Sequence, residues 1–406
     1  MDKRLTEFTS KITAEIRRYI RDSASDLTDE EVQIEIERMI LSDESAAGFD
    51  VAEKASIGEL VFLRTRRELS ILDKLLADED ISEVMVNGPD DIFVERRGRL
   101  ERASLVFENT EELENVIRKI AAKVHREVNE LSPILDARLA DGSRVNAVYK
   151  NIALGGPSLT IRRFPKSRIT MDDLLKFGTI TEEASVFLLK LVQSGYNIFI
   201  SGGTSSGKTT FLNVLSNYIP KNERIVTIED SAELQITGVS NIVRLECRNG
   251  SQGGGQGTTG EVNMKQLIKA SLRMRPNRII VGEVRGEEVL DMIQAMNTGH
   301  DGSLSTGHGN STEGMLYRLE AMFLQAADFP LDAIRRQIAE GIDIMVHLGR
   351  TADGSRRVLE ISEVLGILDG QVALNRLFAF SGTEGLVRTE NELRDTERLV
   401  MRGLVA

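Results

Sequence analysis

The sequence contains a single cysteine, Cys247, among its 406 residues. One cysteine cannot close a disulfide within the chain or supply a CxxC pair, so a disulfide framework and a cysteine-based metal site are both excluded. Such sparing use of cysteine fits a reducing, intracellular setting.

Long apolar runs are missing as well. The best one, residues 186–192, is interrupted by Lys190 and falls far short of the ~20 residues that a membrane span needs. The chain begins Met1-Asp2-Lys3-Arg4 and continues into mixed polar sequence, without the apolar segment of a secretory signal. We therefore expect no signal peptide, and membrane contact only through partners.

Positive charge is the third shortage. The chain carries 51 lysines and arginines against 63 acidic residues, which gives a net charge of -12. Binding to nucleic acid without sequence preference needs a broad positive surface, so this composition argues against it, although a local basic channel stays possible. With 41% hydrophobic and 28% charged residues, the balance is that of an ordinary globular protein, and the length predicts two or three domains.

Apolar periodicity divides the chain into a helical segment, a small α/β domain, a linker and a larger α/β domain. The predicted bounds are 1–65, 66–165, 166–180 and 181–406. In the first part, Thr28 and Glu31 form a capping-box pattern that opens a helix. An accessory helical segment and a partly ordered leader are both compatible with this part.

The small domain alternates strand and helix signals. Strand-like residues 84–86 and 92–94 flank a turn at Asn87-Gly88-Pro89, and Thr110 is predicted to cap a helix. The turn at Asp141-Gly142 precedes a strand over 145–148, and another strand is predicted at 159–161.

In the last part, strands alternate with helices, which predicts a mostly parallel sheet covered by helices. The expected strands lie at 197–201, 224–228, 242–245, 278–281 and 303–306, and the expected helices at 186–192, 208–215, 265–274, 287–297 and 311–324. Residues 344–348 and 358–361 are expected to pair across a turn at Asp353-Gly354, and the glycine-rich residues 250–257 to form a flexible loop.

One segment matches the phosphate-loop pattern GxxxxGK[ST] and lies between a predicted strand and a predicted helix. Its glycines let backbone N–H groups turn inward around phosphate oxygens, and the helix that follows adds its positive end. Lys208 is expected to reach the β- and γ-phosphates of ATP, and the Thr209 hydroxyl to bind Mg²⁺. A glycine- and serine-rich surface loop is the alternative, which the strand before it and the helix after it disfavour. The predicted nucleotide-binding residues are Gly202, Gly203, Thr204, Ser205, Ser206, Gly207, Lys208, Thr209 and Thr210.

Acidic residues follow two of the predicted strands. Glu283 ends the strand at 278–281, where ligands of an open parallel sheet bind, so it is predicted to polarise the attacking water. A surface pairing with Arg285 is the alternative. Glu229 and Asp230 end another strand and are candidates to hold Mg²⁺ through water or to orient the nucleophile.

Two histidines flank the strand at 303–306. His308 follows it and His300 precedes it, and either is a candidate to sense the γ-phosphate or to bridge subunits. No HExxH or Cys/His spacing is present, so no zinc site is expected.

Together these motifs resemble the type II/IV secretion system ATPase superfamily. The phosphate loop, residues 227–230, residues 272–285 and residues 297–303 correspond in order to its Walker A, Asp-box, Walker B and His-box elements. The residues within these motifs are most similar to those of the Tad/Flp pilus assembly ATPases, called CpaF or TadA. Residues 83–88 and 141–146 also resemble that subfamily. The resemblance covers roughly residues 70–380.

The resemblance implies a ring-shaped homohexamer in which a RecA-like ATPase domain follows a separate N-terminal domain and ATP lies between them. It gives Glu283 the role of catalytic glutamate and Glu229 that of the Asp-box acid. It also implies that arginines of the N-terminal domain reach the phosphates, a cationic contribution that accelerates phosphoryl transfer in related enzymes. The matching candidates are Arg144, Arg162 and Arg163, with Arg138 as a further one; a solvated basic strand is the alternative.

The function that follows is ATP hydrolysis by a cytoplasmic motor at the inner face of the membrane, which drives Tad/Flp pilus assembly through inner-membrane platform proteins. A type IV secretion or conjugation ATPase with the same chemistry is the alternative, and residues 297–303 favour the Tad branch. A nucleic-acid translocase is disfavoured by the negative charge. A non-catalytic scaffold is disfavoured by the intact Lys208 and Glu283.

Overall fold

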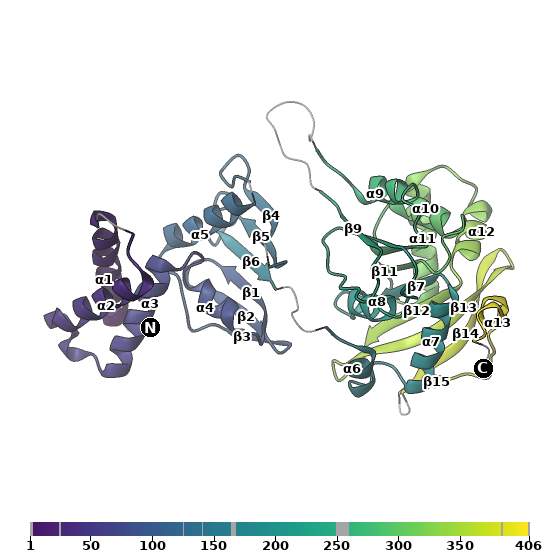
Figure 1. Cartoon of the computed structure of the whole chain (residues 1–406), viewed down its shortest axis with the longest axis horizontal. Helices are drawn as coiled ribbons and strands as arrows, with labels where there is room; N and C mark the ends of the chain where they lie inside the picture. Colours follow the sequence, from purple (N-terminus) through teal and green to yellow (C-terminus); the bar gives the residue numbers. More distant parts are fainter. Residues whose placement is uncertain are drawn as a thin grey trace. The chain divides into compact units, whose positions relative to one another are not determined.

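The computed structural model describes residues 3–23, 26–124, 126–139, 141–163, 168–248, 260–382 and 385–404. The chain divides into two compact units, Met1–Lys166 and Ser167–Ala406, which are described separately (Figure 1). The loop predicted at 250–257 and the first residues of the predicted linker, 166 and 167, lie outside the described residues.

The first unit begins with packed helices. They are α1 (Lys3–Asp22), α2 (Asp29–Ser42), the 3₁₀ turn η1 (Glu44–Gly48) and α3 (Val51–Arg66). The predicted capping box opens α2: the Thr28 hydroxyl accepts the Glu31 N–H at 3.2 Å, and the Glu31 carboxylate accepts the Thr28 N–H at 2.7 Å. Ile12, Ile36 and Ile57, one from each α-helix, are buried in one cluster, so the three helices pack around a common core.

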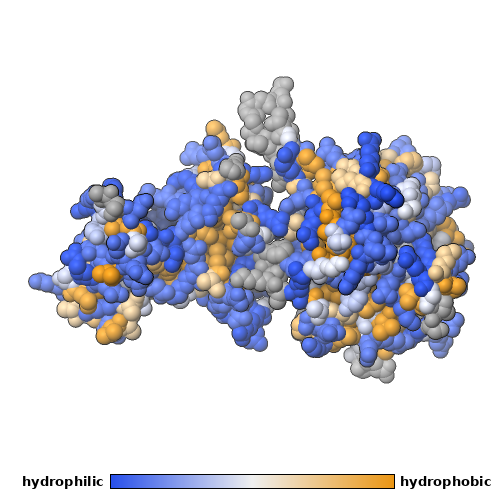
Figure 2. Space-filling view, in the orientation of Figure 1, coloured by the Kyte–Doolittle hydropathy of each residue, from blue (hydrophilic) through white to orange (hydrophobic). Residues whose placement is uncertain are grey.

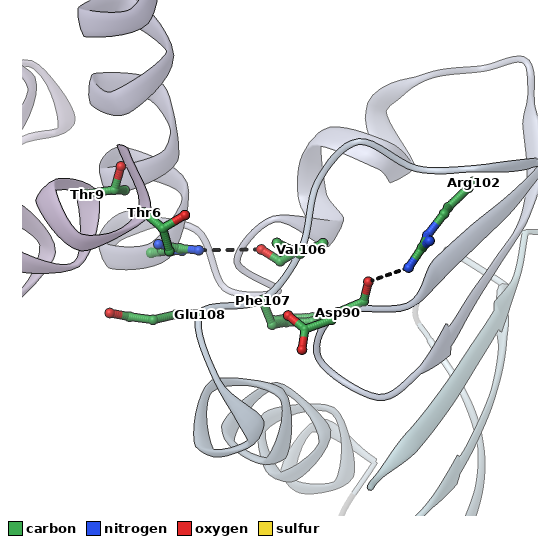
Figure 3. Close-up of a pocket in the computed structure, with 8 residues that line it drawn as sticks. Thr6, Thr9, Asp90, Arg102, Val106, Phe107 and Glu108 are labelled. Atoms are coloured by element: carbon green, nitrogen blue, oxygen red, sulfur yellow. Dashed lines mark hydrogen bonds between the residues drawn. The ribbon is translucent and has the colours of Figure 1, made fainter. Parts of the chain in front are cut away.

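Arg64 of α3 joins these helices to the α/β part of the same unit. Its side chain is 3% exposed, and its Nε lies 3.7 Å from a carboxylate oxygen of Glu112. Its Nη2 donates to the Val106 carbonyl at 3.4 Å. A cavity of about 440 Å³ adjoins this contact (Figure 3) and is lined by Thr6, Thr9, Arg64, Asp90, Arg102, Val106, Phe107 and Glu108.

The α/β part is a six-stranded antiparallel sheet in the order β3-β2-β1-β6-β5-β4. Apolar residues alternate along its strands, and α4 and α5 cover the apolar face (Figure 1). The elements are α4 (Leu72–Ala77), β1 (Ile81–Asn87), β2 (Ile92–Arg96), β3 (Arg99–Arg102), α5 (Thr110–Lys123), β4 (Ile134–Arg138), β5 (Arg144–Val148) and β6 (Ser158–Arg162). The predicted cap of α5 was wrong by one residue: Asn109 has an extended backbone and accepts the Glu112 N–H at 2.9 Å, while Thr110 is already helical.

The second unit contains a nine-stranded sheet in the order β15-β14-β13-β12-β7-β11-β10-β8-β9, and the strands from β12 to β9 are parallel. The predicted α/β class is confirmed, as is the antiparallel pairing of β12 with β13 across residues 353–354. The strands are β7 (Ile198–Gly202), β8 (Ile225–Glu229), β9 (Ile242–Glu246), β10 (Arg278–Val284), β11 (Leu304–His308), β12 (Ile344–Arg350), β13 (Arg356–Leu368), β14 (Gln371–Ser381) and β15 (Gly385–Arg388).

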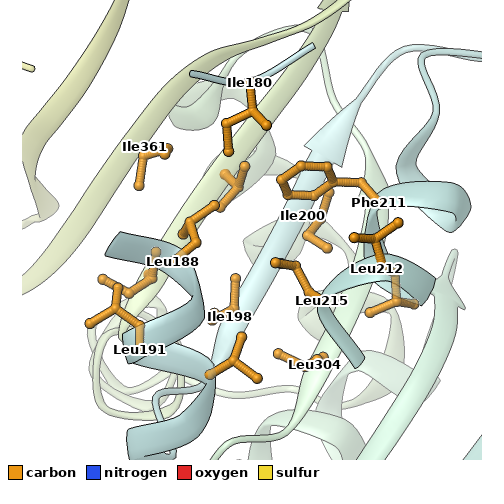
Figure 4. Close-up of a cluster of buried hydrophobic side chains, with 14 of the residues drawn as sticks. Ile180, Leu188, Leu191, Ile198, Ile200, Phe211, Leu212, Leu215, Leu304 and Ile361 are labelled. Carbon is orange, nitrogen blue, oxygen red and sulfur yellow. The ribbon is translucent and has the colours of Figure 1, made fainter. Parts of the chain in front are cut away.

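Helices cover both faces of the parallel part of this sheet. On one face, Leu188 of α7 and Leu215 of α8 pack over Ile198 and Ile200 of β7 (Figure 4). On the other face, a second cluster of buried apolar side chains joins α9, α10, α11 and α12 to strands of the parallel part, β7 among them. The helices are α6 (Met171–Lys176), α7 (Glu182–Ser194), α8 (Lys208–Ser216), α9 (Met264–Ser271), α10 (Glu288–Met296), α11 (Thr312–Ala326), α12 (Leu331–Gly341) and α13 (Glu397–Met401).

The helix α6 lies inside the range that was predicted to be a linker, so that prediction does not describe residues 171–176. Thr170 and Asp173 form a capping box at its start. Met171 and Leu174 are buried in the core of the second unit, which makes the helix part of that fold.

The apolar side chains are gathered mainly inside the units. The face of the molecule in Figure 2 is mostly hydrophilic, with hydrophobic residues dispersed among polar ones. Within the described residues, no helix is both long enough and apolar enough to cross a bilayer.

Candidate active site

The candidate site lies where parallel strands of the second unit end. In the register of the sheet, His308 at the end of β11 pairs with Gly202 at the end of β7, and β10 lies on the other side of β11. Because parallel strands present their carboxyl ends at the same edge, residues that follow β7, β10 and β11 converge there. The structure thus brings together Lys208, Glu283 and His308, which are far apart in the sequence.

The phosphate loop connects β7 to α8. Ser205 and Gly207 have left-handed backbones, with φ of 56° and 96°, which turn the loop back before α8 begins at Lys208. Gly202 leaves no room for a side chain, because a Cβ there would lie 2.5 Å from the Leu348 carbonyl oxygen. At Gly203, by contrast, nothing approaches within 4 Å of an added Cβ. The tight turn, the open space and the N-terminal end of α8 fit a bound phosphate group.

Lys208 is largely buried beside this loop. Its Nζ donates to the carbonyls of Gly202 at 3.1 Å and Gly203 at 2.9 Å, and lies 3.2 Å from His308 Nδ1. Burial lowers the pKa of Lys208, and the negative charge of Glu283 opposes that shift. The predicted phosphate-binding ammonium is therefore placed at the loop and close to an acidic group.

Glu283 is held by two partners. Its Oε1 lies 2.8 Å from His308 Nε2, and its Oε2 accepts from Arg285 Nε at 2.8 Å and Nη2 at 2.6 Å. The Arg285 pairing that was an alternative from the sequence is therefore present, together with a contact to His308. Burial lowers the pKa of His308 against the opposing pull of Glu283. A neutral ring fits both contacts, with Nε2–H donating to Glu283 and Nδ1 accepting from Lys208.

His300 is separated from this cluster. It precedes β11, whereas His308 ends that strand, and its Nδ1 lies 3.1 Å from the Ala295 carbonyl oxygen. Of the two histidines proposed from the sequence, the structure therefore places only His308 beside Lys208 and Glu283.

Glu229 ends β8 and is 3% exposed. Its Oε1 accepts the backbone N–H groups of Glu233 at 2.9 Å and Leu234 at 3.0 Å, which fixes the turn after the strand. A Cβ added to Gly282 would lie 3.0 Å from Glu229 Cγ, so the carboxylate packs closely against β10.

A magnesium site would have to combine protein and phosphate oxygens. Among the described residues, no group of three or more His, Cys, Asp or Glu side chains could hold a metal ion. Magnesium in nucleotide sites commonly needs only one or two protein oxygens besides phosphates and water. The hydroxyl of Thr209, directly after Lys208 at the start of α8, and the carboxylate of Glu229 are oxygen donors of that kind.

The first unit groups the predicted arginines differently from the sequence expectation. Arg144 of β5 stands directly opposite Arg138 of β4 and Arg162 of β6, so these side chains share one face of the sheet. Arg163 follows Arg162 and points to the other face, where its Nη1 donates to the carbonyls of Asp78 and, at 3.0 Å, Ile81. Glu83 of β1 stands opposite Arg162 in the same register, so the arginine row also adjoins a carboxylate.

Sequence reasoning missed a second histidine near the loop. His347 of β12 is 7% exposed, and its Nδ1 lies 2.8 Å from the Ser201 hydroxyl at the end of β7. Burial lowers its pKa, which keeps the ring neutral near pH 7. No local pattern could have revealed this contact, because it depends on the register of β12 against β7.

Comparison with known proteins places these motifs in a family. Residues 65–385 match the family described as "Type II/IV secretion system protein". The chain is 34% identical over 295 residues to the conjugal transfer protein TrbB of Rhizobium radiobacter, covering 72% of this chain and 86% of that protein. It is 34% identical over 319 residues to the type IV secretion system protein PtlH of Bordetella pertussis, covering 72% and 93%.

An archaeal relative matches more closely over a shorter stretch. The uncharacterized protein MJ0781 of Methanocaldococcus jannaschii is 44% identical over 244 residues, and the match spans 58% of this chain but only 33% of that protein. Among solved structures, the ATPase DotB of Legionella pneumophila is similar with a TM-score of 0.52 and 20% identity, over 73% of this chain and 81% of that one. This likeness confirms the predicted fold, an N-terminal α/β domain followed by a RecA-like domain.

The relatives separate the broad prediction from the narrow one. The expected superfamily is confirmed, whereas the narrower Tad/Flp assignment is not supported, because the relatives with functional names are conjugal transfer and type IV secretion proteins. The match over residues 65–385 extends through both the arginine row and the phosphate loop. The chain therefore belongs to the Type II/IV secretion system protein family, whose members are secretion ATPases.

Proposed function

We propose that this chain hydrolyses ATP at the loop 202–210 and uses the energy to drive a type IV secretion or conjugation machine. The observation that carries the proposal is the hydrogen-bonded chain from Lys208 through His308 to Glu283 at the ends of parallel strands. It combines a cation for the phosphates with a carboxylate for the water in one place.

The loop and α8 would bind the phosphates. Backbone N–H groups of residues 203–208 and the N-terminal end of the helix favour negative charge. Lys208 would exchange its contacts with the Gly202 and Gly203 carbonyls for phosphate oxygens. Mg²⁺ would be held by Thr209 and, through water, by Glu229, and it supplies charge that stabilises the phosphoryl group in transfer.

Glu283 would act as the general base. Water attacks the γ-phosphorus, its proton passes to the carboxylate, and the bond from that phosphorus to the leaving ADP oxygen breaks. Each carboxylate oxygen can accept two hydrogen bonds, so Oε1 can accept one from the attacking water beside its contact with His308.

The arginine row is proposed to serve the same nucleotide. Arg144 and Arg162 keep the role that the resemblance implies, and their shared face adds Arg138 as the third member. Arg163 is proposed instead to hold the strand end through the Ile81 carbonyl.

The names of the relatives support the secretion branch of this proposal. Conjugal transfer and type IV secretion proteins favour that branch over Tad/Flp pilus assembly, which rests on the wording of residues 297–303. A homohexamer, inner-membrane partners and a cytoplasmic position at the membrane remain part of the proposal, as implied by the family resemblance.

The test compares purified wild-type protein with Lys208→Ala. We expect the wild type to release phosphate from ATP and the variant to lose activity and bind a fluorescent ATP analogue much more weakly, with oligomer size measured on the same samples. Arg388→Ala is the matched control, since Arg388 lies on the edge strand β15 and pairs with Glu183. Equal hydrolysis by all of these proteins would contradict the proposed site.

A further inference from the structure

The turn between β12 and β13 lies against the phosphate loop. In the register of the sheet, Leu348 of β12 pairs with Gly202, and β12 continues to Arg350 beyond that point. A Cβ added to Gly207 would lie 3.5 Å from Arg356 Cδ, at the start of β13. Both strands of this hairpin therefore approach the loop, at its first and last glycines.

The hairpin is rigid at its tip and at its base. Asp353 accepts the Thr351 hydroxyl at 2.6 Å and the Ser355 N–H at 3.0 Å. These hydrogen bonds lower the pKa of Asp353 to about 2, so the carboxylate is charged throughout the physiological range. At the base, Val358 N–H donates to the Thr179 carbonyl at 2.8 Å. The backbone that carries Arg350 is therefore held by hydrogen bonds at both ends of the hairpin.

Arg350 uses that position to grip the phosphate loop. Its Nε and Nη2 both donate to the Ser205 carbonyl oxygen, at 3.3 and 3.2 Å. Ser205 is the loop residue that adopts a left-handed backbone without being glycine, with φ of 56°. Such a conformation costs about 1–2 kcal/mol in a non-glycine residue and persists when its surroundings support it.

The grip also sets the direction of a neighbouring N–H group. The Ser205 carbonyl and the Ser206 N–H belong to one trans peptide unit, so they point in opposite directions. Arg350 holds the carbonyl on the hairpin side, and the Ser206 N–H on the opposite side donates to the Gly203 carbonyl at 3.4 Å, within the loop. A phosphate bound in the loop would take this N–H in place of its long hydrogen bond to Gly203.

We infer that Arg350 is a positioning residue of the phosphate loop. Its guanidinium fork holds the Ser205–Ser206 peptide in the orientation that receives phosphate, and it does so from the hairpin rather than from the loop. The inference rests on the proposed function and adds to it a residue outside the motif. Lysine is a partial substitute, because its ammonium can donate to the Ser205 carbonyl but lacks the second, fixed donor of the guanidinium.

The experiment measures KM and kcat for ATP with Arg350→Ala, Arg350→Lys, Arg388→Ala and wild type. We expect Arg350→Ala to raise KM about fivefold to tenfold with kcat within about twofold, because a charged hydrogen bond is lost that acts on binding. Arg350→Lys should recover part of this loss, and Arg388→Ala should match the wild type. Thermal unfolding of each variant should agree within a few degrees, which separates this effect from loss of the fold.

A salt series distinguishes a hydrogen-bonded brace from a distant charge. An exposed charge acting through space is screened as ionic strength rises from about 0.05 to 0.3 M, whereas a direct hydrogen bond is affected much less. The ratio of KM values between Arg350→Ala and wild type should therefore persist at high salt. A ratio that falls to one at high salt, or an unchanged KM in Arg350→Ala, overturns the inference. If wild type itself shows no activity above Lys208→Ala, the proposed function fails instead.

Discussion

The two sheets of this protein gather charged side chains in different ways. In the second unit, the strands at the site run parallel. Lys208, Glu283 and His308 meet there because each follows or ends a strand at the same edge. In the first unit, strands run antiparallel, and Arg138, Arg144 and Arg162 meet because they stand opposite one another across the sheet. A parallel sheet thus builds a site from strand ends, and an antiparallel sheet builds one from its face.

The two clusters also differ in how deeply they are buried and in their mixture of positive and negative charges. Lys208 and Glu229 are buried, at 7% and 3% exposed, and the second unit combines cations with carboxylates. The arginine row is partly exposed and adjoins a single carboxylate, that of Glu83, so screening by solvent weakens its interactions. We therefore expect the largest effects on turnover from the second unit and smaller ones from the first.

The largest expected effect is that of Glu283→Gln. Glutamine keeps the size of the side chain but cannot accept the proton of water, so kcat should fall about 10²–10⁴-fold. Binding of a fluorescent ATP analogue should remain within a few fold of wild type, because the phosphate loop is intact. Steady-state hydrolysis and equilibrium binding check this, and a variant with normal turnover would remove Glu283 from the mechanism.

Substitutions in the arginine row should have the next largest effect. Arg144→Ala and Arg162→Ala should each lower kcat about tenfold to a hundredfold, since a cation near the developing phosphate charge is lost from a partly exposed position. Phosphate release at saturating ATP measures this loss. Activity within twofold of wild type in both variants would leave the row as a solvated basic surface.

Arg163→Ala is the matched control for the row, because the residue is adjacent in sequence and faces the other way. It should retain most of its turnover but lower the free energy of unfolding of the first unit by about 1–2 kcal/mol, through loss of the contact with the Ile81 carbonyl. Urea unfolding of each variant gives the comparison. A loss of turnover equal to that of Arg162→Ala would return Arg163 to the phosphate-binding group.

The smallest expected effect is a response to mild acid around His347 of the second unit. The folded-state pKa of His347 lies below its ordinary value of 6.5, so the unfolded chain takes up the proton first as the pH falls. Its contribution to stability is therefore full above pH 6.5 and is lost as the pH drops from there toward the folded pKa. Arginines do not titrate in this range, so the row should not respond.

Several charged or polar groups surround His347 and define the control. Glu360 stands opposite it on β13 and favours the protonated ring, whereas Lys208 disfavours it and Ser201 bonds its Nδ1. Hydrogen-exchange protection of β7 and β12, corrected for the intrinsic rate at each pH, should fall between about pH 7.5 and 5.5 in wild type. The fall should be smaller in His347→Gln. Equal falls in both proteins would assign the response to other groups, such as His308.

Local patterns were sufficient for much of the fold. The phosphate loop, the capping box at Thr28 and the pairing of β12 with β13 were all predicted from short stretches, because their signals lie within a few adjacent residues. The helix α6 was missed because the polar residues before it resemble a linker. Only the burial of Met171 and Leu174 shows that the helix belongs to the core. The motifs could not separate the branches of the family, because they carry the shared chemistry of ATP hydrolysis and not the identity of the machine that is driven.

The sequence by itself determined which residues could do chemistry: a glycine-lined turn, a lysine and acids at strand ends are contiguous features that chain geometry turns into a site. Only the tertiary structure decided which partners these residues have. The contacts of Arg350 with Ser205, of His347 with Ser201 and of Arg163 with the Ile81 carbonyl all depend on strand order and register. Register is set by the burial of whole strand faces, so no short stretch of sequence contains it.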